Sequence, residues 1–472
     1  MIFLILVLGL VLRLISLDQS FWLDEATSGI VVRNFSFWEI ISKFSPGDFH
    51  PPLYYLLLKF WSLVFGTSEI GLRLFSVLAG ILTIWMVFKI AKELNPSTSL
   101  RMVSQSNHWK FPELAAILLA TSGLHLYYSQ EARMYSLATF FVSLSFFLFV
   151  KTLEKSRVGN WIAFSIFLTA SFFTHYLTIL MLPVYWLIGI FAKKDRNWWK
   201  KFIGSHIILV VLFIVWFPIF STQFSAGISV SGSSPIWWQT LGKTSLKEIL
   251  LVPTKFILGR ISLDNKPLYA AVVIVVLAGY GFVFFRSIRL IRSIRYLYIL
   301  WLWLFIPTIL AVLLGLWLSV FSYFRLLFVL PAFYLILALA ISWLPRKIFI
   351  PALIFVIGVN LVSSLAYLTN SKFQREDWRG LVQFIEGDPL REKSIVVFPA
   401  KSQMEAYRYY KKEANIAGPD ETPEKYAIIW LMRYAQAISD PRDMTRIKIE
   451  DLGFKKISEQ DFNAVVVWKY QK

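Results

Sequence analysis

The chain has 472 residues, of which 57% are hydrophobic, and a formal net charge of +19. A soluble protein of this length does not need so large an apolar fraction, so the composition places most of the chain in lipid. The absence of cysteine excludes disulfide bonds and thiolate metal sites. Residues 371–472 carry 18 basic and 16 acidic residues, so the basic excess lies in the hydrophobic part, which argues against a nucleic-acid partner.

Eleven apolar runs are long enough to be membrane spans, which need about 20 residues each. The first run has neither a basic start nor a small-residue cleavage site, so we expect it to be a span rather than a signal peptide. The predicted spans are about 1–17, 70–91, 112–127, 135–150, 160–174, 176–192, 202–220, 268–285, 296–320, 326–344 and 348–366.

Short basic clusters, such as AKKDRNWWKK after the sixth run and RSIRLIRSIR after the eighth, follow every second span. Because cytoplasmic loops are enriched in Lys and Arg, this side is expected to be cytoplasmic. The long loops at about 18–69 and 221–267 and the C-terminus are then extracytoplasmic, in a plasma or inner membrane. The second loop contains SAGISVSGSSP, whose small polar residues predict a flexible lid or linker.

Two adjacent acids, Asp24 and Glu25, follow the first span in the stretch FWLDEATSG. Carboxylates near a bilayer are disfavoured unless they are solvated, paired or used. One reading is a solvated loop. The other, which we favour, is a pair at the membrane surface in which one carboxylate acts as a base.

Two short helices are expected later in the same loop. Ser36 and Glu39 form an S-x-x-E capping box, and the apolar face of SFWEIISKF fits a helix lying in the interface or packed on the bundle. In FHPPLYYLLLKFW the two prolines suit a helix start. His50 would then stand at the positive helix end, with Tyr54 in the first turn, where a phosphate could bind; an ordinary helix opening is the alternative.

The turn HLYYSQEARMYS joins the third and fourth spans. Glu131 and Arg133 are expected either to pair with each other or to line a polar cavity. Tyrosines such as Tyr135 offer hydroxyls and flat faces that suit sugar rings. His175, in FFTHYLT, and Arg325, in FSYFRLL, lie at later turns on the same predicted side. Convergence on one side indicates a site more strongly than any single residue does.

Residues 371–472 have a different pattern. SIVVFPA and FNAVVVWKY predict strands, and MEAYRYYKK between them predicts a helix. About 100 residues are enough for a separate core. We therefore expect a small extracytoplasmic α/β domain over 371–472, following a transmembrane domain over 1–370.

The motifs LDEATSG, HPPLYYLLLKFW and YYSQEARMYS, in this order, resemble the GT-C membrane glycosyltransferases. The chain is most similar to the superfamily of protein O-mannosyltransferases and lipid A aminoarabinose transferases, including bacterial dolichyl-phosphate-mannose-protein mannosyltransferase-like members. The resemblance is strongest over about 10–190. This resemblance implies a GT-C fold, with Asp24 as the first choice of catalytic carboxylate and Glu25 as the second. It also implies that Glu131 is an acid that organises the cavity and that His50 lies close to a lipid-linked phosphate. The aminoarabinose transferases have lysine at the His50 position, which leaves the donor and a divalent metal open.

This resemblance implies an inverting hexosyltransferase with a polyprenyl-phosphate sugar donor and a lipid, glycan or protein acceptor. Asp24 would accept the proton of the acceptor hydroxyl, and His50, Arg133 or Arg325 would hold the departing phosphate. The alternative is a polytopic transporter or a non-catalytic protein that binds lipid-linked sugar. We favour the enzyme because the acids lie at outer span ends, whereas transporters place ionisable residues near the middle of the bilayer.

Overall fold

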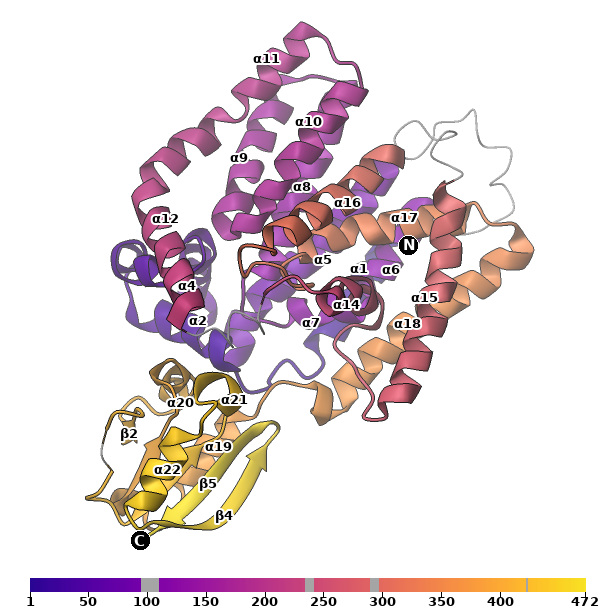
Figure 1. The fold of residues 1–472 in the computed structure, drawn as a ribbon. Coiled ribbons are helices and arrows are strands. Elements are labelled where there is room, and N and C mark those ends of the chain that lie inside the picture. The colour runs from indigo at the N-terminus through magenta and orange to yellow at the C-terminus, as the bar shows by residue number, and fades with distance from the viewer. Residues whose placement is uncertain (95–109, 234–241, 289–296, 422) are drawn as a thin grey trace.

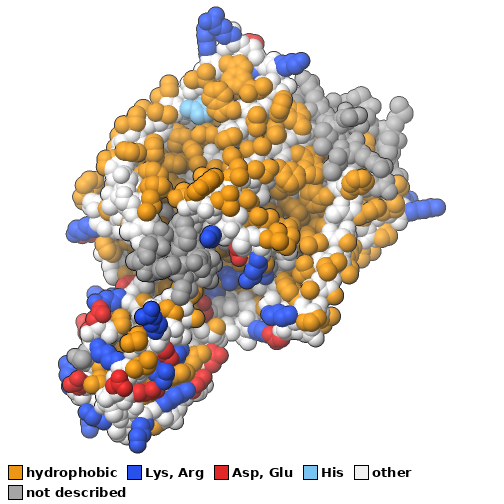
Figure 2. All heavy atoms as spheres, viewed as in Figure 1, with side chains coloured by type: hydrophobic (Ala, Val, Ile, Leu, Met, Phe, Trp, Pro, Cys, Tyr) orange, Lys and Arg blue, Asp and Glu red, His pale blue; other side chains and the backbone are white. Residues whose placement is uncertain are grey.

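The computed structural model of the protein describes residues 1–94, 110–233, 242–288, 297–421 and 423–472. A bundle of apolar helices forms the body, and a small sheet lies at one end of it (Figure 1). Hydrophobic side chains cover the visible face of the bundle, whereas acidic and basic side chains mix on the sheet (Figure 2). Arg101 and most of the basic stretch 286–295 lie outside the described residues. Both contributed to the prediction of which side of the membrane is cytoplasmic.

Each of the eleven predicted spans contains an apolar helix, and six described helices are long and apolar enough to cross a membrane. The protein is a multi-pass membrane protein. The longer helices are α5 (Glu69–Leu94), α8 (Tyr135–Glu154), α12 (Ile207–Ser233), α15 (Lys266–Ile288), α16 (Leu297–Leu314) and α18 (Arg346–Thr369). The shorter ones are α1 (Ile2–Leu14), α6 (Phe111–Ala120), which α7 (Gly123–Ser129) follows, α9 (Val158–Thr174), α10 (Met181–Phe191), α11 (Arg196–Gly204) and α17 (Leu330–Ser342).

The helices differ in how much of their surface the protein itself covers. Of the most apolar window of α8, 72% is buried inside the protein, against 17% for α15. Helix α15 instead exposes large side chains such as Ile274 and Val275. In lipid an exposed apolar side chain costs nothing, so such a helix is stable at the periphery of the bundle. Helix α8 therefore belongs to the centre of the bundle and α15 to its edge.

The first long loop contains α2 (Leu23–Asn34), α3 (Phe37–Glu39) and α4 (Leu53–Phe65). The predicted capping box is confirmed, because Ser36 and Glu39 exchange the two expected hydrogen bonds. The predicted helix start after the prolines is confirmed as well, since α4 begins directly after Pro52.

The second long loop differs from its prediction. Residues 225–233, the first part of SAGISVSGSSP, continue helix α12 instead of forming a flexible segment; the end of this stretch lies outside the described residues. Glycine costs about 1 kcal/mol in a helix interior, but each added residue extends an existing ladder of hydrogen bonds and needs no new nucleus. Helix α14 (Leu246–Leu258) follows in the same loop.

The C-terminal part forms a five-stranded sheet with the order β2-β1-β3-β5-β4. Strand β1 pairs in parallel with β2 and β3, whereas β5 pairs antiparallel with β3 and β4. The strands and the helix predicted from SIVVFPA, FNAVVVWKY and MEAYRYYKK are confirmed. The elements are α19 (Trp378–Glu386), β1 (Ser394–Val397), α20 (Met404–Tyr410), β2 (Ile416–Ala417), β3 (Ile428–Met432), α21 (Gln436–Ser439), α22 (Met444–Asp451), β4 (Lys455–Phe462) and β5 (Val465–Gln471).

Helix α20 holds the sheet against the beginning of helix α2. The hydroxyl of Tyr410 accepts a hydrogen bond from the Phe21 backbone N–H at 2.7 Å. Tyr409 packs on the Phe21 ring with the ring centroids 5.0 Å apart, and its hydroxyl donates to the Thr67 carbonyl at 2.6 Å. The C-terminal part therefore lies directly over the segment that carries Asp24 and Glu25.

Candidate active site

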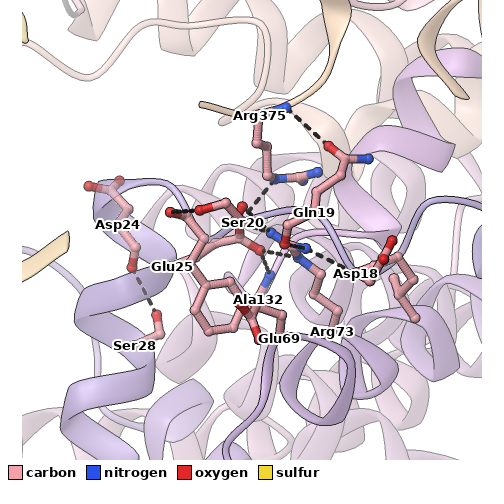
Figure 3. A network of polar contacts seen from close by, with 12 residues as sticks. Asp18, Gln19, Ser20, Asp24, Glu25, Ser28, Glu69, Arg73, Ala132 and Arg375 are labelled. Atoms are coloured by element: carbon pink, nitrogen blue, oxygen red, sulfur yellow. Dashed lines mark hydrogen bonds and ion pairs between the residues drawn. The ribbon is translucent and has the colours of Figure 1, made fainter. Parts of the chain in front are cut away.

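The two acids that open helix α2 lie in different environments. Both stand in the first turn, where the positive end of the helix dipole favours carboxylates. Glu25 is fully buried, whereas 42% of the Asp24 side chain is exposed. Figure 3 shows the Asp24 carboxylate pointing away from the cluster in which Glu25 meets two arginines. The structure thus separates two residues that the sequence presents as a pair.

Glu25 is held by three hydrogen bonds and by one ion pair without a hydrogen bond. Arg73 contacts its two oxygens at 2.6 and 2.8 Å, Arg375 lies 3.0 Å from Oε2, and the Ala132 backbone N–H donates to Oε1 at 2.7 Å. Burial alone raises the pKa of Glu25, but the charges of Arg73 and Arg375 and the hydrogen bonds outweigh it and hold the pKa below its usual value. Glu25 is therefore an ionised carboxylate that joins α2, α5, the turn before α8 and the C-terminal segment.

Arg73 also fixes the stretch that leads into α2. Its guanidinium donates to the carbonyls of Leu17 and Ser20, both at 2.9 Å, and to that of Gln19. We did not single out this residue from the sequence. A signal was present, because an arginine inside an apolar span is rare and marks a functional or structural site.

Asp24 has one charged contact. Arg133, which is buried, places Nη2 3.5 Å from Asp24 Oδ2 and donates from Nη1 to the Tyr55 hydroxyl at 3.1 Å. The sequence analysis selected Tyr54, but Tyr55 is the neighbour that contacts Arg133. Successive residues of a helix point about 100° apart, so they face different surroundings. Tyr54 packs instead between Tyr55 and Phe75, with ring centroids 5.5 and 6.1 Å apart.

Glu131 and Arg133 form no salt bridge among the described residues, so their mutual pairing is not seen, and the polar cavity stays a prediction. The Arg133 guanidinium turns toward Asp24, whereas Glu131 is buried and its Oε2 has no hydrogen-bond partner among the described residues. Burial raises the pKa of Glu131 to about 7, with the Arg375 charge opposing this and the Glu25 charge adding to it. Glu131 can therefore gain or lose a proton near neutral pH.

The two predicted histidines lie together on the other side of Arg133. His50 Nδ1 is 3.3 Å from Asp48 Oδ1, and the rings of His50 and His175 are 6.5 Å apart. Tyr135 lies 5.7 Å from the His175 ring. Burial, followed by the nearby charges, holds the pKa of His175 well below its usual value. Within the part of the chain that the structure describes, no group of three or more His, Asp or Glu side chains could hold a metal ion.

Two further arginines border this region. The predicted residue Arg325 is partly buried and donates to the Ser319 carbonyl at 2.6 Å. Arg260, which the sequence analysis missed, has an exposed side chain that donates to the Tyr127 hydroxyl at 3.0 Å and lies 4.7 Å from the centre of that ring. Basic side chains are visible in the recess between bundle and sheet (Figure 2). An isolated arginine in a loop gives no signal in a single sequence.

Glu376 brings one more carboxylate from the C-terminal segment. Its Oε1 accepts a hydrogen bond from the Tyr434 hydroxyl at 3.2 Å, and its Oε2 has no hydrogen-bond partner among the described residues. Burial raises the pKa of Glu376 to about 7, and the charge of Asp24 contributes in the same direction. Glu376 and Tyr434 therefore form a hydrogen-bonded pair near enough to Asp24 for its charge to act on both. No local pattern in the sequence sets this acid apart from the others in the tail.

Known proteins share this fold. Residues 49–221 match the family model of the dolichyl-phosphate-mannose-protein mannosyltransferases. A comparison with curated protein sequences finds no match. The crystal structures of ArnT from Cupriavidus metallidurans, bound to undecaprenyl phosphate or in the apo state, align over 98% of this chain and 97% of theirs. Their TM-scores are 0.59 and 0.58, and their identities are 13% and 12%.

A cryo-EM structure of the arabinofuranosyltransferase AftD from mycobacteria aligns over the whole of this chain and 39% of its own, with a TM-score of 0.55 and 14% identity. At such identities the likeness concerns the fold. The family match and the fold together confirm the resemblance read from the sequence motifs. The chain is a multi-pass membrane protein with the GT-C fold, and its family resemblance is to the dolichyl-phosphate-mannose-protein mannosyltransferases.

Proposed function

We propose that the protein is an inverting glycosyltransferase that moves a hexose from a polyprenyl-phosphate donor to an acceptor hydroxyl of a lipid, glycan or protein. The observation that carries this proposal is the separation of the acidic pair. Glu25 accepts three hydrogen bonds and pairs with two arginines, whereas Asp24 is half-exposed and, among the described residues, has one arginine contact at 3.5 Å. A general base needs a free lone pair within reach of its substrate, and Asp24 has one.

In the proposed reaction Asp24 accepts the proton of the acceptor hydroxyl. The acceptor oxygen forms a bond to the anomeric carbon from the face opposite the phosphate, and the bond from that carbon to the phosphate oxygen breaks. Polyprenyl phosphate leaves with the bonding electrons, so one displacement inverts the anomeric configuration. Arg133 contacts the Asp24 carboxylate at 3.5 Å, and we expect the acceptor to approach the exposed side of Asp24, with the Glu376–Tyr434 pair nearby.

The departing phosphate needs positive charge close to it. Arg133, Arg325 and the exposed Arg260 supply fixed charges around the site. His50 precedes the two prolines before α4, and the backbone N–H groups and dipole at the start of this helix also favour an anion. The fold shared with ArnT, which has been crystallised with undecaprenyl phosphate, supports a polyprenyl phosphate as the carrier.

We place the reaction on the extracytoplasmic side of a plasma or inner membrane. Helix α11, which carries the basic stretch AKKDRNWWKK, lies at the end of the bundle away from the sheet (Figure 1). Positive loops mark the cytoplasmic side, so the sheet and the start of α2 would lie outside.

Purified protein in lipid nanodiscs, supplied with polyprenyl-phosphate mannose and related donors, tests this function through the release of polyprenyl phosphate. Loss of a general base costs about 10²–10⁴ in rate, so Asp24→Asn should lower turnover by about that factor and still bind undecaprenyl phosphate. Asp18→Asn makes the same chemical change at an exposed position in the same loop and should turn over like the wild type.

Wild-type turnover by Asp24→Asn would show that Asp24 is not the general base. A wild-type protein that binds undecaprenyl phosphate but turns over none of the donors would instead be a non-catalytic binding protein, and the proposed function would be wrong.

A further inference from the structure

The segment between α18 and α19 brings one arginine into the candidate site from the far end of the chain. Arg375 is buried; its Nε forms an ion pair without a hydrogen bond, and its two Nη atoms donate hydrogen bonds to the transmembrane part. Nε lies 3.0 Å from Glu25 Oε2, Nη1 donates to the Tyr367 hydroxyl at 2.9 Å, and Nη2 donates to the Tyr127 carbonyl at 3.3 Å. The guanidinium also lies 4.5 Å from the centre of the Tyr127 ring. Arg375 thus joins α2, α7 and α18.

The sheet fixes the backbone that carries this arginine. In the turn between β4 and β5, the side-chain amide of Asn463 donates to the carbonyls of Arg375 at 2.7 Å and Ser371 at 3.0 Å. Asn463 has a φ of 50°, a left-handed conformation that asparagine tolerates better than most residues. The Arg375 backbone N–H donates to Gln19 Oε1 at 3.0 Å. The hairpin turn and the loop before α2 therefore hold Arg375 from two sides.

A second arginine on Glu25 is not needed to neutralise it. Arg73 already forms a two-point contact with the carboxylate, so Arg375 makes the buried group an Arg–Glu–Arg triad with excess positive charge. Burying such a triad is expensive and often adds no net stability, although it can specify one arrangement of the groups that it joins. The arrangement here is that of α2, because Glu25 and Asp24 are adjacent in its first turn.

We propose that Arg375 is a positioning residue of the glycosyltransferase: through Glu25 it sets the rotation of α2 and so directs the Asp24 carboxylate to the open side of the site. Side chains of adjacent helical residues keep an angle of about 100° between them, so fixing one fixes the direction of the other. The C-terminal segment then belongs to the active site. This inference rests on the proposed function.

Three variants test the positioning role in the nanodisc assay with the donor that the wild type uses. A displacement of about 1 Å at a reacting group can cost about 10²-fold in rate, so Arg375→Gln should lower kcat by about this factor with little change in the KM for the donor. Arg375→Lys keeps the charge and should recover part of the loss. Asn463→Gly keeps the left-handed backbone, removes the amide contacts and should lower kcat in the same direction.

Arg379→Gln is the matched control, because Arg379 lies nearby in the first turn of α19 and contacts Glu69 at 3.4 Å and the Asp18 carbonyl at 2.8 Å without touching Glu25. It should keep the wild-type kcat. If Arg375→Gln does not fold, the kcat of Asn463→Gly tests the positioning role instead. Wild-type kcat in both Arg375→Lys and Asn463→Gly would overturn the positioning role and leave the proposed function standing. A wild-type protein without turnover would overturn both.

Discussion

Two neighbouring carboxylates can differ completely in what they are able to do. Asp24 and Glu25 have the same charge and share one helical turn, yet three hydrogen bonds and two arginine charges occupy Glu25, and Asp24 keeps a side open to solvent. The number of donors around each group decides this difference. Glu131 differs from both: it is buried like Glu25, but one of its oxygens has no hydrogen-bond partner among the described residues.

Glu131 should make stability depend on pH. Its pKa is raised to about 7 in the folded protein from an ordinary value of 4.5, so the folded state binds the proton more tightly. The free energy of unfolding should therefore fall as the pH rises from about 4.5 to about 7, by about 1.4 kcal/mol for each unit of the pKa difference. Glu131→Gln removes this dependence, so its advantage in thermal unfolding over the wild type should be larger at pH 8 than at pH 5.

Glu413→Gln is the control for this measurement, because Glu413 is exposed. Its unfolding temperature should follow that of the wild type at both pH values. An equal effect of Glu131→Gln at pH 5 and pH 8 would show that Glu131 does not titrate between them.

At the scale of elements, the contact between α2 and α20 depends on a small residue. A side chain at Gly29 would place its Cβ 2.6 Å from the Tyr409 ring, which already packs on Phe21. Other contacts of α20 with this region run through the hydroxyls of Tyr409 and Tyr410 and through Arg33, which donates to the Tyr409 carbonyl at 3.3 Å. The close approach of these helices is what brings the C-terminal part over the acids.

Gly29→Ala should therefore destabilise the protein by about 1–3 kcal/mol, the usual cost of overpacking a closed contact. Thermal unfolding monitored by tryptophan fluorescence measures this loss. Gly47→Ala, at a position where an added Cβ meets nothing within 4 Å, should leave the unfolding temperature close to that of the wild type. Equal unfolding temperatures for the two variants would mean that Tyr409 moves aside without cost.

At the scale of the whole molecule, the two ends of the bundle should face opposite sides of the membrane. Because the chain has no cysteine, a single introduced thiol reports its own side. Lys412→Cys, on the exposed surface beyond α20, should react with a membrane-impermeant maleimide in intact cells. Lys200→Cys, on the exposed surface of α11, should react only after the membrane is opened. The reverse labelling pattern would put the candidate site in the cytoplasm.

The sequence by itself determined the apolar helices, the strands of the C-terminal part, the capping box at Ser36 and the start of α4. These features follow from hydropathy, periodicity and capping, which depend on residues close together in the chain. The same local reasoning was wrong at 225–233, where a helix continues through residues that favour loops.

Only the tertiary structure decided how the charges are shared. In the folded chain Glu25 contacts Arg73 and Arg375, whereas Asp24 is partly exposed beside Arg133. Arg260 and Glu376 also lie near the site. The physical reason is that the state of a buried carboxylate depends on which cations surround it in space. Those cations come from segments far apart in the chain, and no local pattern connects them.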